Sequence, residues 1–183
     1  MRVIAGTAGG IRLLTPEGMQ TRPTIERVKE AIFSSVHFRL PGMRVLDLFA
    51  GTGQMGIEAL SRGAVWADLV DCRSDACALI RKNLERTGLA GRAAVHCMDY
   101  AQFLRQRREP YDLILLDPPY AENFLENALK TISEIDILAN DGIIITERSA
   151  DRPMEAVFHG LTLQKDRRYG TVRIAAFVKG GRS

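Results

Sequence analysis

The sequence of 183 residues contains only three cysteines, three histidines and one tryptophan, and it has no long uncharged apolar run. A membrane-spanning helix needs about 18 or more consecutive apolar residues, and no stretch approaches that length. The first residues, Met1 to Gly6, include Arg2 and reach glycine too early to form the apolar core of a secretion signal. These absences predict a soluble, cytoplasmic protein with no membrane partner.

The few cysteines and histidines also restrict the chemistry. Cys72, Cys77 and Cys97 are odd in number and form no CxxC pair, so the sequence predicts no disulfide framework. We expect all three to be reduced and buried, as small apolar side chains are. The histidines stand singly along the chain, which predicts no metal site.

What the sequence does contain is an ordinary globular composition, 46% hydrophobic and 26% charged, which predicts a sizeable core. The net charge of +3 is unevenly distributed. Residues 1–44 carry +4, residues 45–147 carry −6 and residues 148–183 carry +5. Basic ends around an acidic middle favour two partners of different charge, with a polyanion at the ends. Solvated surface charge is the alternative explanation.

From residue 43 onward, apolar β-rich runs alternate with helical patterns, which is typical of a parallel α/β sheet. The expected strands are 43–48, 66–71, 93–97, 111–117 and 142–147, and the expected helices are 55–62, 74–87, 99–108 and 122–138. Two later strands, 161–166 and 171–178, are separated by too few residues for a crossover helix. The sequence therefore predicts five parallel strands and a C-terminal antiparallel hairpin.

The first 42 residues have a different pattern. Arg2–Ala5 and Ile11–Leu14 flank a glycine-rich turn and predict a small hairpin, followed by a helix at 25–38 capped by Thr24. Some 40 residues bury too little surface to fold alone, so we expect residues 1–42 to pack as an extension on a domain formed by 43–183. Arg27 and Lys29 are expected on the solvated face of the helix.

The most informative motif is Asp117-Pro118-Pro119-Tyr120, directly after the apolar run at 113–116. Proline fixes φ and donates no backbone hydrogen bond, so the two prolines form a stiff turn whose carbonyls can accept. Asp117 offers an acceptor for N–H groups and Tyr120 a stacking face. The motif suits a flat ring that bears an amine, although a strand-ending turn with a capping aspartate is the simpler alternative.

A glycine-rich loop, Asp47 to Gly53, follows the first core strand and leads into a helix. Gly51, Gly53 and Gly56 match the dinucleotide fingerprint GxGxxG, a weak signal that also allows a nicotinamide-dependent dehydrogenase. Glycines allow a tight turn and the close approach of a ligand to the backbone.

Acidic residues at successive strand ends argue against the dinucleotide. Asp47, Asp71, Asp99 and Asp117 each follow a predicted strand, and in a doubly wound sheet such ends border one crevice. Four carboxylates would repel a pyrophosphate but suit S-adenosylmethionine, which has a sulfonium and an ammonium against one carboxylate. Asp71 is placed for ribose hydroxyls and Asp99 for the adenine amine. Taken singly, each aspartate is explained as well by a helix cap.

With these residues placed, the chain resembles the class I, seven-strand methyltransferases that modify exocyclic amines. Over nearly its whole length it is similar to the bacterial 16S ribosomal RNA guanine-N2 methyltransferase family. The most specific stretches are Thr21–Thr24 and Asp47–Ala64. The sequence departs from the family at Asp71-Cys72, where such enzymes more often carry glutamate. The shorter aspartate side chain could still reach the ribose hydroxyls, so the difference would affect the affinity for the cofactor more than the family assignment.

The resemblance implies a role for each group of residues. Catalysis would rest on Asp117, Pro118 and Tyr120. S-adenosylmethionine would be bound by Asp47, Phe49, Ala50, Gly51, Gly53, Asp71, Cys72, Asp99, Tyr100 and Thr24. The basic ends would bind 16S RNA, in a small subunit or an assembly intermediate, through Arg2, Arg12, Arg22, Arg167 and Arg168. A monomer is expected.

Three other functions stay open at this stage. The tetrapeptide suits adenine N6 as well as guanine N2, but DNA adenine enzymes usually add a recognition domain for which this length leaves little room. A dehydrogenase would lack a substrate domain and fits the acids poorly. A catalytically silent RNA-binding protein on the same fold would have degenerate cofactor residues, which are intact here.

Overall fold

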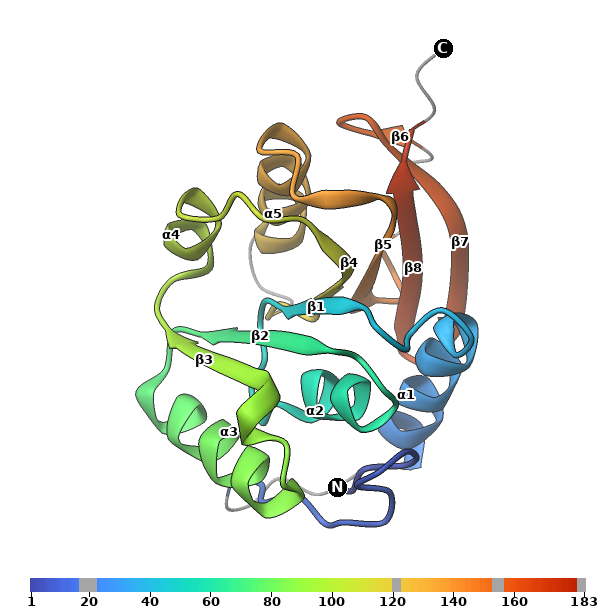
Figure 1. Ribbon diagram of the computed structural model, residues 1–183. Coiled ribbons are helices and arrows are strands. Elements are labelled where there is room, and N and C mark those ends of the chain that lie inside the picture. Colours follow the sequence, from blue (N-terminus) through green and yellow to red (C-terminus); the bar gives the residue numbers. More distant parts are fainter. Residues whose placement is uncertain (17–22, 120–122, 153–156, 181–183) are drawn as a thin grey trace.

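The computed structural model describes residues 1–16, 23–119, 123–152 and 157–180 (Figure 1). A central sheet is covered by helices on both faces. Its strands are β1 (Arg44–Asp47), β2 (Trp66–Asp71), β3 (Ala93–Cys97), β4 (Tyr111–Leu116), β5 (Leu138–Ser149), β6 (Val157–Phe158), β7 (Leu161–Tyr169) and β8 (Val172–Lys179).

The strand order is β3-β2-β1-β4-β5-β8-β7-β6. Strands β1 to β5 pair in parallel, and β8, β7 and β6 pair antiparallel. The predicted parallel sheet and C-terminal hairpin are confirmed, but the sheet has eight strands, because β6 adds a two-residue edge strand too short to predict from its pattern. The order reverses between β1 and β4, and ligands of such sheets bind beyond the carboxyl ends at this point.

The helices are α1 (Pro23–Val36), α2 (Gln54–Ser61), α3 (Ser74–Thr87), α4 (Tyr100–Arg105) and α5 (Phe124–Glu134), with a 3-10 turn, η1, at Ala90–Arg92. Figure 1 shows α1, α2 and α3 on one face of the sheet and α4 and α5 on the other. Within the described ranges, no helix is long and apolar enough to cross a membrane.

Several predicted boundaries were wrong for local reasons. The helix predicted at 122–138 ends at Glu134, because Asp136 takes a positive φ of 55° and Leu138 begins β5. Helix α1 begins at Pro23, so Thr24 lies inside its first turn instead of capping it. The N-terminal hairpin is reduced to a single antiparallel bridge between Arg2 and Arg12.

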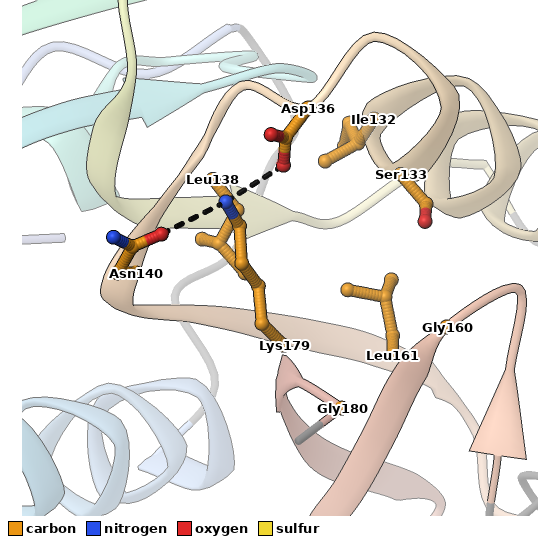
Figure 2. Close-up of a pocket in the computed structure, with 9 residues that line it drawn as sticks. All are labelled: Ile132, Ser133, Asp136, Leu138, Asn140, Gly160, Leu161, Lys179 and Gly180. Carbon is orange, nitrogen blue, oxygen red and sulfur yellow. Dashed lines mark hydrogen bonds and ion pairs between the residues drawn. The ribbon is translucent and has the colours of Figure 1, made fainter. Parts of the chain in front are cut away.

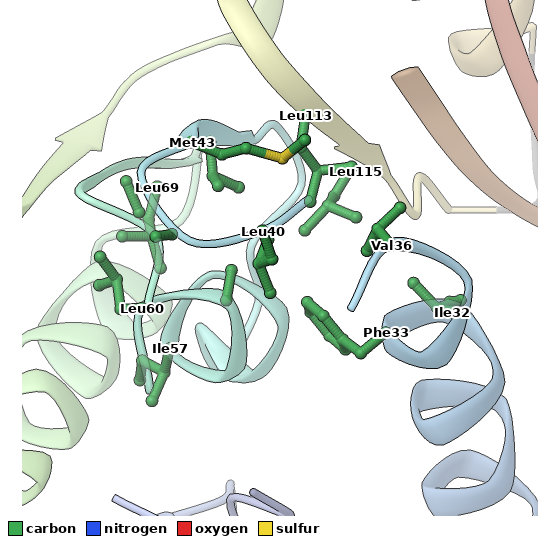
Figure 3. Packing of buried hydrophobic residues seen from close by; sticks show 14 of the residues in the cluster. Ile32, Phe33, Val36, Leu40, Met43, Ile57, Leu60, Leu69, Leu113 and Leu115 are labelled. Carbon is green, nitrogen blue, oxygen red and sulfur yellow. The ribbon is translucent and has the colours of Figure 1, made fainter. Parts of the chain in front are cut away.

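Two apolar clusters form the core, one on each face of the sheet. On the face of α1–α3, Phe33 and Ile57 pack with Leu69 and Leu115 (Figure 3). On the other face, Phe103 and Leu129, with their neighbours on α4 and α5, cover β4 and β5. Parallel strands buried on both faces read as continuous apolar runs, which explains Leu113 to Leu116.

A buried ion cluster attaches the N-terminal segment, residues 1–13, to helices α1 and α2. The fully buried Glu58 carboxylate lies 3.2 Å from Lys29 Nζ and 2.7 Å from Arg62 Nε. Its two oxygens also accept the backbone N–H groups of Ile4 and Ala5, at 2.8 and 3.1 Å. Lys29 was expected in solvent and is instead 2% exposed, donating to the Arg2 carbonyl at 2.6 Å. Burial lowers the pKa of Lys29, and Glu58 opposes that shift.

The segment also approaches α2 closely at Gly6, which gives a test of its attachment. A Cβ on Gly6 would lie 1.9 Å from the Ser61 carbonyl oxygen, whereas a Cβ on Gly10 would meet nothing within 4 Å. Both glycines have a φ of +87°, so the backbone strain of a substitution is matched. We predict that Gly6→Ala lowers the free energy of unfolding by roughly 1–3 kcal/mol more than Gly10→Ala. Equal losses in urea denaturation would show that the contact at Ser61 is unimportant.

Candidate active site

The loop after β1 is held firmly on one side and open on the other. The Ala50 N–H donates to the Val70 carbonyl at 2.9 Å, and the Gly53 N–H donates to Ala50 at 2.7 Å. Gly51 and Gly53 both take positive φ, of 55° and 77°. A Cβ on Gly53 would press on Ile80 at 3.1 Å, but one on Gly51 would meet nothing within 4 Å. The backbone at Gly51 therefore borders free space that a ligand can fill.

That space belongs to a pocket of about 200 Å³ at the carboxyl ends of β1, β2 and β4. Six of the predicted site residues line it: Asp47, Phe49, Ala50, Gly51, Asp71 and Asp117. Of the nine other residues that line the pocket, Met1, Pro16 and Gln54 were not foreseen from the sequence. Met1 brings the N-terminal segment into the wall, and Gln54 brings in α2.

Asp47 is the buried acid of this pocket, only 3% exposed. Its Oδ2 accepts the Gly56 N–H at 2.9 Å, which ties the strand end to the first turn of α2. Burial raises the pKa of Asp47 to about 7, with a further contribution from the charge of Asp71. A carboxyl group held in this way favours a cationic ligand, because a nearby positive charge stabilises its ionised form.

Asp71 holds the loop in place from β2. One carboxylate oxygen accepts the Gly51 N–H and the other accepts the Arg73 N–H, both at 2.9 Å. Each oxygen keeps a second lone pair that can accept from a ligand hydroxyl. Asp71 therefore shapes the loop as well as facing the pocket, a structural role that the sequence did not reveal.

Asp117 follows β4, lines the pocket and is exposed to solvent there. Loss of hydration at its carboxyl group, followed by the charges of Glu147 and Asp47, raises the pKa of Asp117 to about 8. Pro118 is buried and Pro119 exposed. Tyr120 lies outside the described residues, so its stacking role stays a prediction.

Asp99 and Tyr100 lie beyond β3. The Asp99 Oδ1 atom caps α4 by accepting hydrogen bonds from the N–H groups of Ala101 and Gln102, at 2.9 and 3.2 Å. Asp99 therefore has the helix-capping role that was the alternative explanation for it. Neither residue lines the 200 Å³ pocket directly.

Tyr100 connects to the pocket through an aromatic group. The Phe49 ring, which does line the pocket, lies 5.1 Å from the Tyr100 ring and 6.3 Å from that of Phe124, centroid to centroid. Burial raises the pKa of Tyr100, as does the charge of Asp99. Phe124 was missed, and its signal was an aromatic residue at the start of the helix after the tetrapeptide.

The remaining cofactor candidates are less informative. The side chain of Thr24 is not among the described parts of the chain. Cys72 follows Asp71 and is exposed, as is Cys97, so the expected burial holds only for Cys77. Among the described residues, no three histidine, cysteine, aspartate or glutamate side chains are grouped so that they could hold a metal ion.

The arginine candidates lie near the same edge of the sheet. Arg2 and Arg12 face each other across the N-terminal bridge and line a shallow hollow together with Met1, which also reaches the 200 Å³ pocket. Arg167 and Arg168 are exposed at the end of β7. The start of β8 opposite them pairs with Ser149 at the carboxyl end of β5. Arg22 lies outside the described residues.

A larger pocket, of about 590 Å³, lies at the opposite edge, beside the amino end of β5 (Figure 2). Its only lysine, Lys179, is paired with Asp136 at 2.6 Å and lies 3.4 Å from the Asn140 side-chain oxygen. None of the predicted site residues lines it. The chemistry that the sequence predicts is therefore gathered in the smaller pocket.

Comparisons with known proteins agree with this placement. The family model described as "Conserved hypothetical protein 95" matches residues 1–178. The chain belongs to this family. The Bacillus subtilis protein YlbH is 36% identical, over 99% of this chain and 100% of its own. The Escherichia coli ribosomal RNA small subunit methyltransferase D is 31% identical, over 94% of this chain and 86% of its own.

A solved structure extends the relation to three dimensions. The Escherichia coli protein yhhF superposes with a TM-score of 0.88 at 27% identity, over 100% of this chain and 99% of its own. The family predicted from the motifs, that of the small-subunit ribosomal RNA methyltransferases, is thereby confirmed, and so is the fold.

The raised pKa of Asp47 predicts how stability varies with pH. Between the ordinary range of an aspartate and about pH 7 the folded protein binds more protons than the unfolded chain, so stability falls as pH rises through this window. We predict that Asp47→Asn, whose amide oxygen can still accept from Gly56, stabilises the protein at pH 8 by roughly 2–4 kcal/mol but changes it little at pH 4. Denaturation at both pH values measures this. A variant that is less stable than wild type at pH 8 would contradict the assignment.

Proposed function

We propose that this protein transfers a methyl group from S-adenosylmethionine to the exocyclic N2 amine of a guanine in 16S ribosomal RNA. As a member of its family, the chain is an S-adenosylmethionine-dependent ribosomal RNA methyltransferase. The observation that carries the finer proposal is that the Asp117 carboxylate and the glycine loop border one pocket, with the Pro118 turn beside it.

The residues of the pocket fit this cofactor. S-adenosylmethionine supplies a methyl group on a positively charged sulfur. Asp47, Asp71 and Asp117 make the pocket acidic, which favours that charge and disfavours a dinucleotide pyrophosphate. In the proposal, Asp71 accepts from the ribose hydroxyls, the backbone at Gly51 lies along the cofactor, and Phe49 with Tyr100 and Asp99 holds the adenine.

The target amine would be held by Asp117 and Pro118. An exocyclic amine is a poor nucleophile, because its lone pair is delocalised into the ring. In the proposal, the Asp117 carboxylate and the Pro118 carbonyl accept its N–H groups and align the lone pair with the bond that breaks. The same oxygens stabilise the positive charge that develops on the nitrogen. Tyr120 would stack on the base, a contact worth about 1–3 kcal/mol at nucleic-acid sites.

The arginines would hold the RNA around the pocket. The base must leave its stack to reach Asp117, which favours a loop or single-stranded target. In the proposal, Arg2 and Arg12 bind the backbone on one side of the pocket and Arg167 and Arg168 on the other. We further propose that the enzyme acts as a cytoplasmic monomer on RNA within a small subunit or an assembly intermediate.

One experiment tests the proposed function. The protein is incubated with isotopically labelled S-adenosylmethionine and, separately, naked 16S RNA, assembled small subunits and duplex DNA. Mass spectrometry then identifies the methylated nucleoside. The proposal expects N2-methylguanosine from RNA. N6-methyladenosine, or transfer only to DNA, would overturn it in favour of adenine chemistry.

Removing the acceptor should separate turnover from cofactor binding. We predict that Asp117→Ala lowers the single-turnover rate about 100-fold or more, the range of a lost electrostatic contact to the reacting group. Its affinity for S-adenosylhomocysteine should change only a few-fold, because the main ribose contact is assigned to Asp71. Single-turnover kinetics measures the rate, and calorimetry measures the affinity for S-adenosylhomocysteine. Loss of binding together with loss of rate would place Asp117 in the cofactor site instead.

The role of the N-terminal arginines should appear in the salt dependence. Each neutralised phosphate releases condensed counterions, so we predict that Arg2→Ala with Arg12→Ala reduces the slope of log affinity against log salt by up to about 2. The matched control is Arg105→Ala with Arg108→Ala, which removes the same charge from the exposed end of α4 and the loop after it. If both double variants give the wild-type slope, Arg2 and Arg12 are only solvated surface.

A further inference from the structure

Glu147 is placed beside Asp117 by the register of the sheet. On the parallel strands β4 and β5, Leu115 pairs with Ile145 and Leu116 with Thr146. The next position brings Asp117 level with Glu147, and side chains level with each other on neighbouring strands point to the same face. Both residues also line one small cavity of about 30 Å³.

We propose that Asp117 and Glu147 form a carboxyl pair that holds one proton when the cofactor is absent and releases it when the positively charged cofactor binds. Glu147 is then a positioning residue for the proposed methyl transfer, because it acts through Asp117. The inference rests on the proposed cofactor but not on the identity of the methylated base.

The charges around the pair support this. Asp47 on β1 lines the same cavity and adds a third negative charge. Lys29, on α1, also lines it, but its ammonium is engaged by Glu58 and the Arg2 carbonyl.

A second group of charges lies on the other side of Glu147, in a small hollow that Pro118 also lines. It consists of Glu126, Arg148 and Arg152, with Arg148 bonded to Glu126 at 3.2 Å. Loss of hydration at the carboxyl group is the main reason that the pKa of Asp117 rises to about 8, and the negative charges of Glu147 and Asp47 raise it further. Like charges so close cannot all ionise freely, and they titrate as one system.

The pair also gives the reaction a proton acceptor. With the cofactor bound, both carboxylates are ionised and Asp117 accepts from the target amine. As the nitrogen lone pair forms the N–CH₃ bond, the S–CH₃ bonding electrons stay on sulfur, which becomes neutral. The nitrogen then carries the positive charge, and one of its protons passes to Asp117, where the pair holds it again. Atoms and charge balance without any further reagent.

Calorimetry tests the pair without RNA. Binding of S-adenosylmethionine and of S-adenosylhomocysteine is measured near pH 7.5 in two buffers with different heats of ionisation, which gives the number of protons released. In wild type, S-adenosylmethionine should release more protons than its neutral-sulfur product, by up to about one. Glu147→Gln should reduce that difference, because Asp117 then keeps only the effects of desolvation and Asp47, and the control Glu126→Gln should leave it at the wild-type value.

The outcomes separate the two proposals. An unchanged difference in Glu147→Gln would overturn the carboxyl pair and leave the methyltransferase proposal intact. Failure of the wild type to bind either ligand would overturn the proposed cofactor, and the pair with it. If only the Gln variant fails to bind, Glu147→Asp is measured, since it keeps the charge. If Glu147→Asp binds both ligands and S-adenosylmethionine again releases more protons than S-adenosylhomocysteine, the pair is supported. If it binds both ligands with equal proton release, the pair is contradicted.

Discussion

The constraint on which the site depends is the gathering of several carboxylates, one of them buried, at the carboxyl ends of neighbouring parallel strands. Asp47 is almost fully buried, and its carboxylate accepts a hydrogen bond from the backbone N–H of Gly56. Leaving such a group charged is costly unless a positive charge comes near it. The strand order adds electrostatic repulsion to this desolvation cost, because β1 and β4 are neighbours at the switch point and bring Asp47 close to Asp117. A cationic ligand relieves the repulsion, so the fold itself selects the charge of what it binds.

The N-terminal segment connects this pocket to the basic surface. Glu58, on α2, accepts hydrogen bonds from the backbone N–H groups of Ile4 and Ala5, and Lys29, on α1, donates to the backbone carbonyl of Arg2 in the same segment. Met1 then lies between the two regions, lining both the acidic pocket and the hollow beside Arg2 and Arg12. The Thr52 hydroxyl, in the cofactor loop, contacts the Met1 sulfur at 3.4 Å. The residues proposed to contact RNA and those proposed to contact the cofactor therefore adjoin one another at Met1, although Met1 and Thr52 are some 50 positions apart in the chain.

The sequence predicted what depends on local pattern and missed what depends on contacts across the chain. Alternating apolar and amphipathic runs were enough for the parallel sheet, and the acids at its strand ends were found by position alone. The burial of Lys29 could not be predicted, because its partner Glu58 is nearly 30 residues away and only folding joins them. The same holds for the loop-holding role of Asp71 and for Met1 in the pocket wall. The exposure of Cys72 and Cys97 depends on where each strand ends, which composition does not specify.

We expect the acidic pocket, and not the larger hollow at the other edge of the sheet, to bind the cofactor. A crystal structure with S-adenosylhomocysteine tests it most directly. We predict ligand density against Gly51, with the ribose within hydrogen-bond distance of Asp71 and the sulfur on the side of Asp117. Density in the 590 Å³ pocket beside Lys179 and Asp136, with the acidic pocket empty, would contradict it.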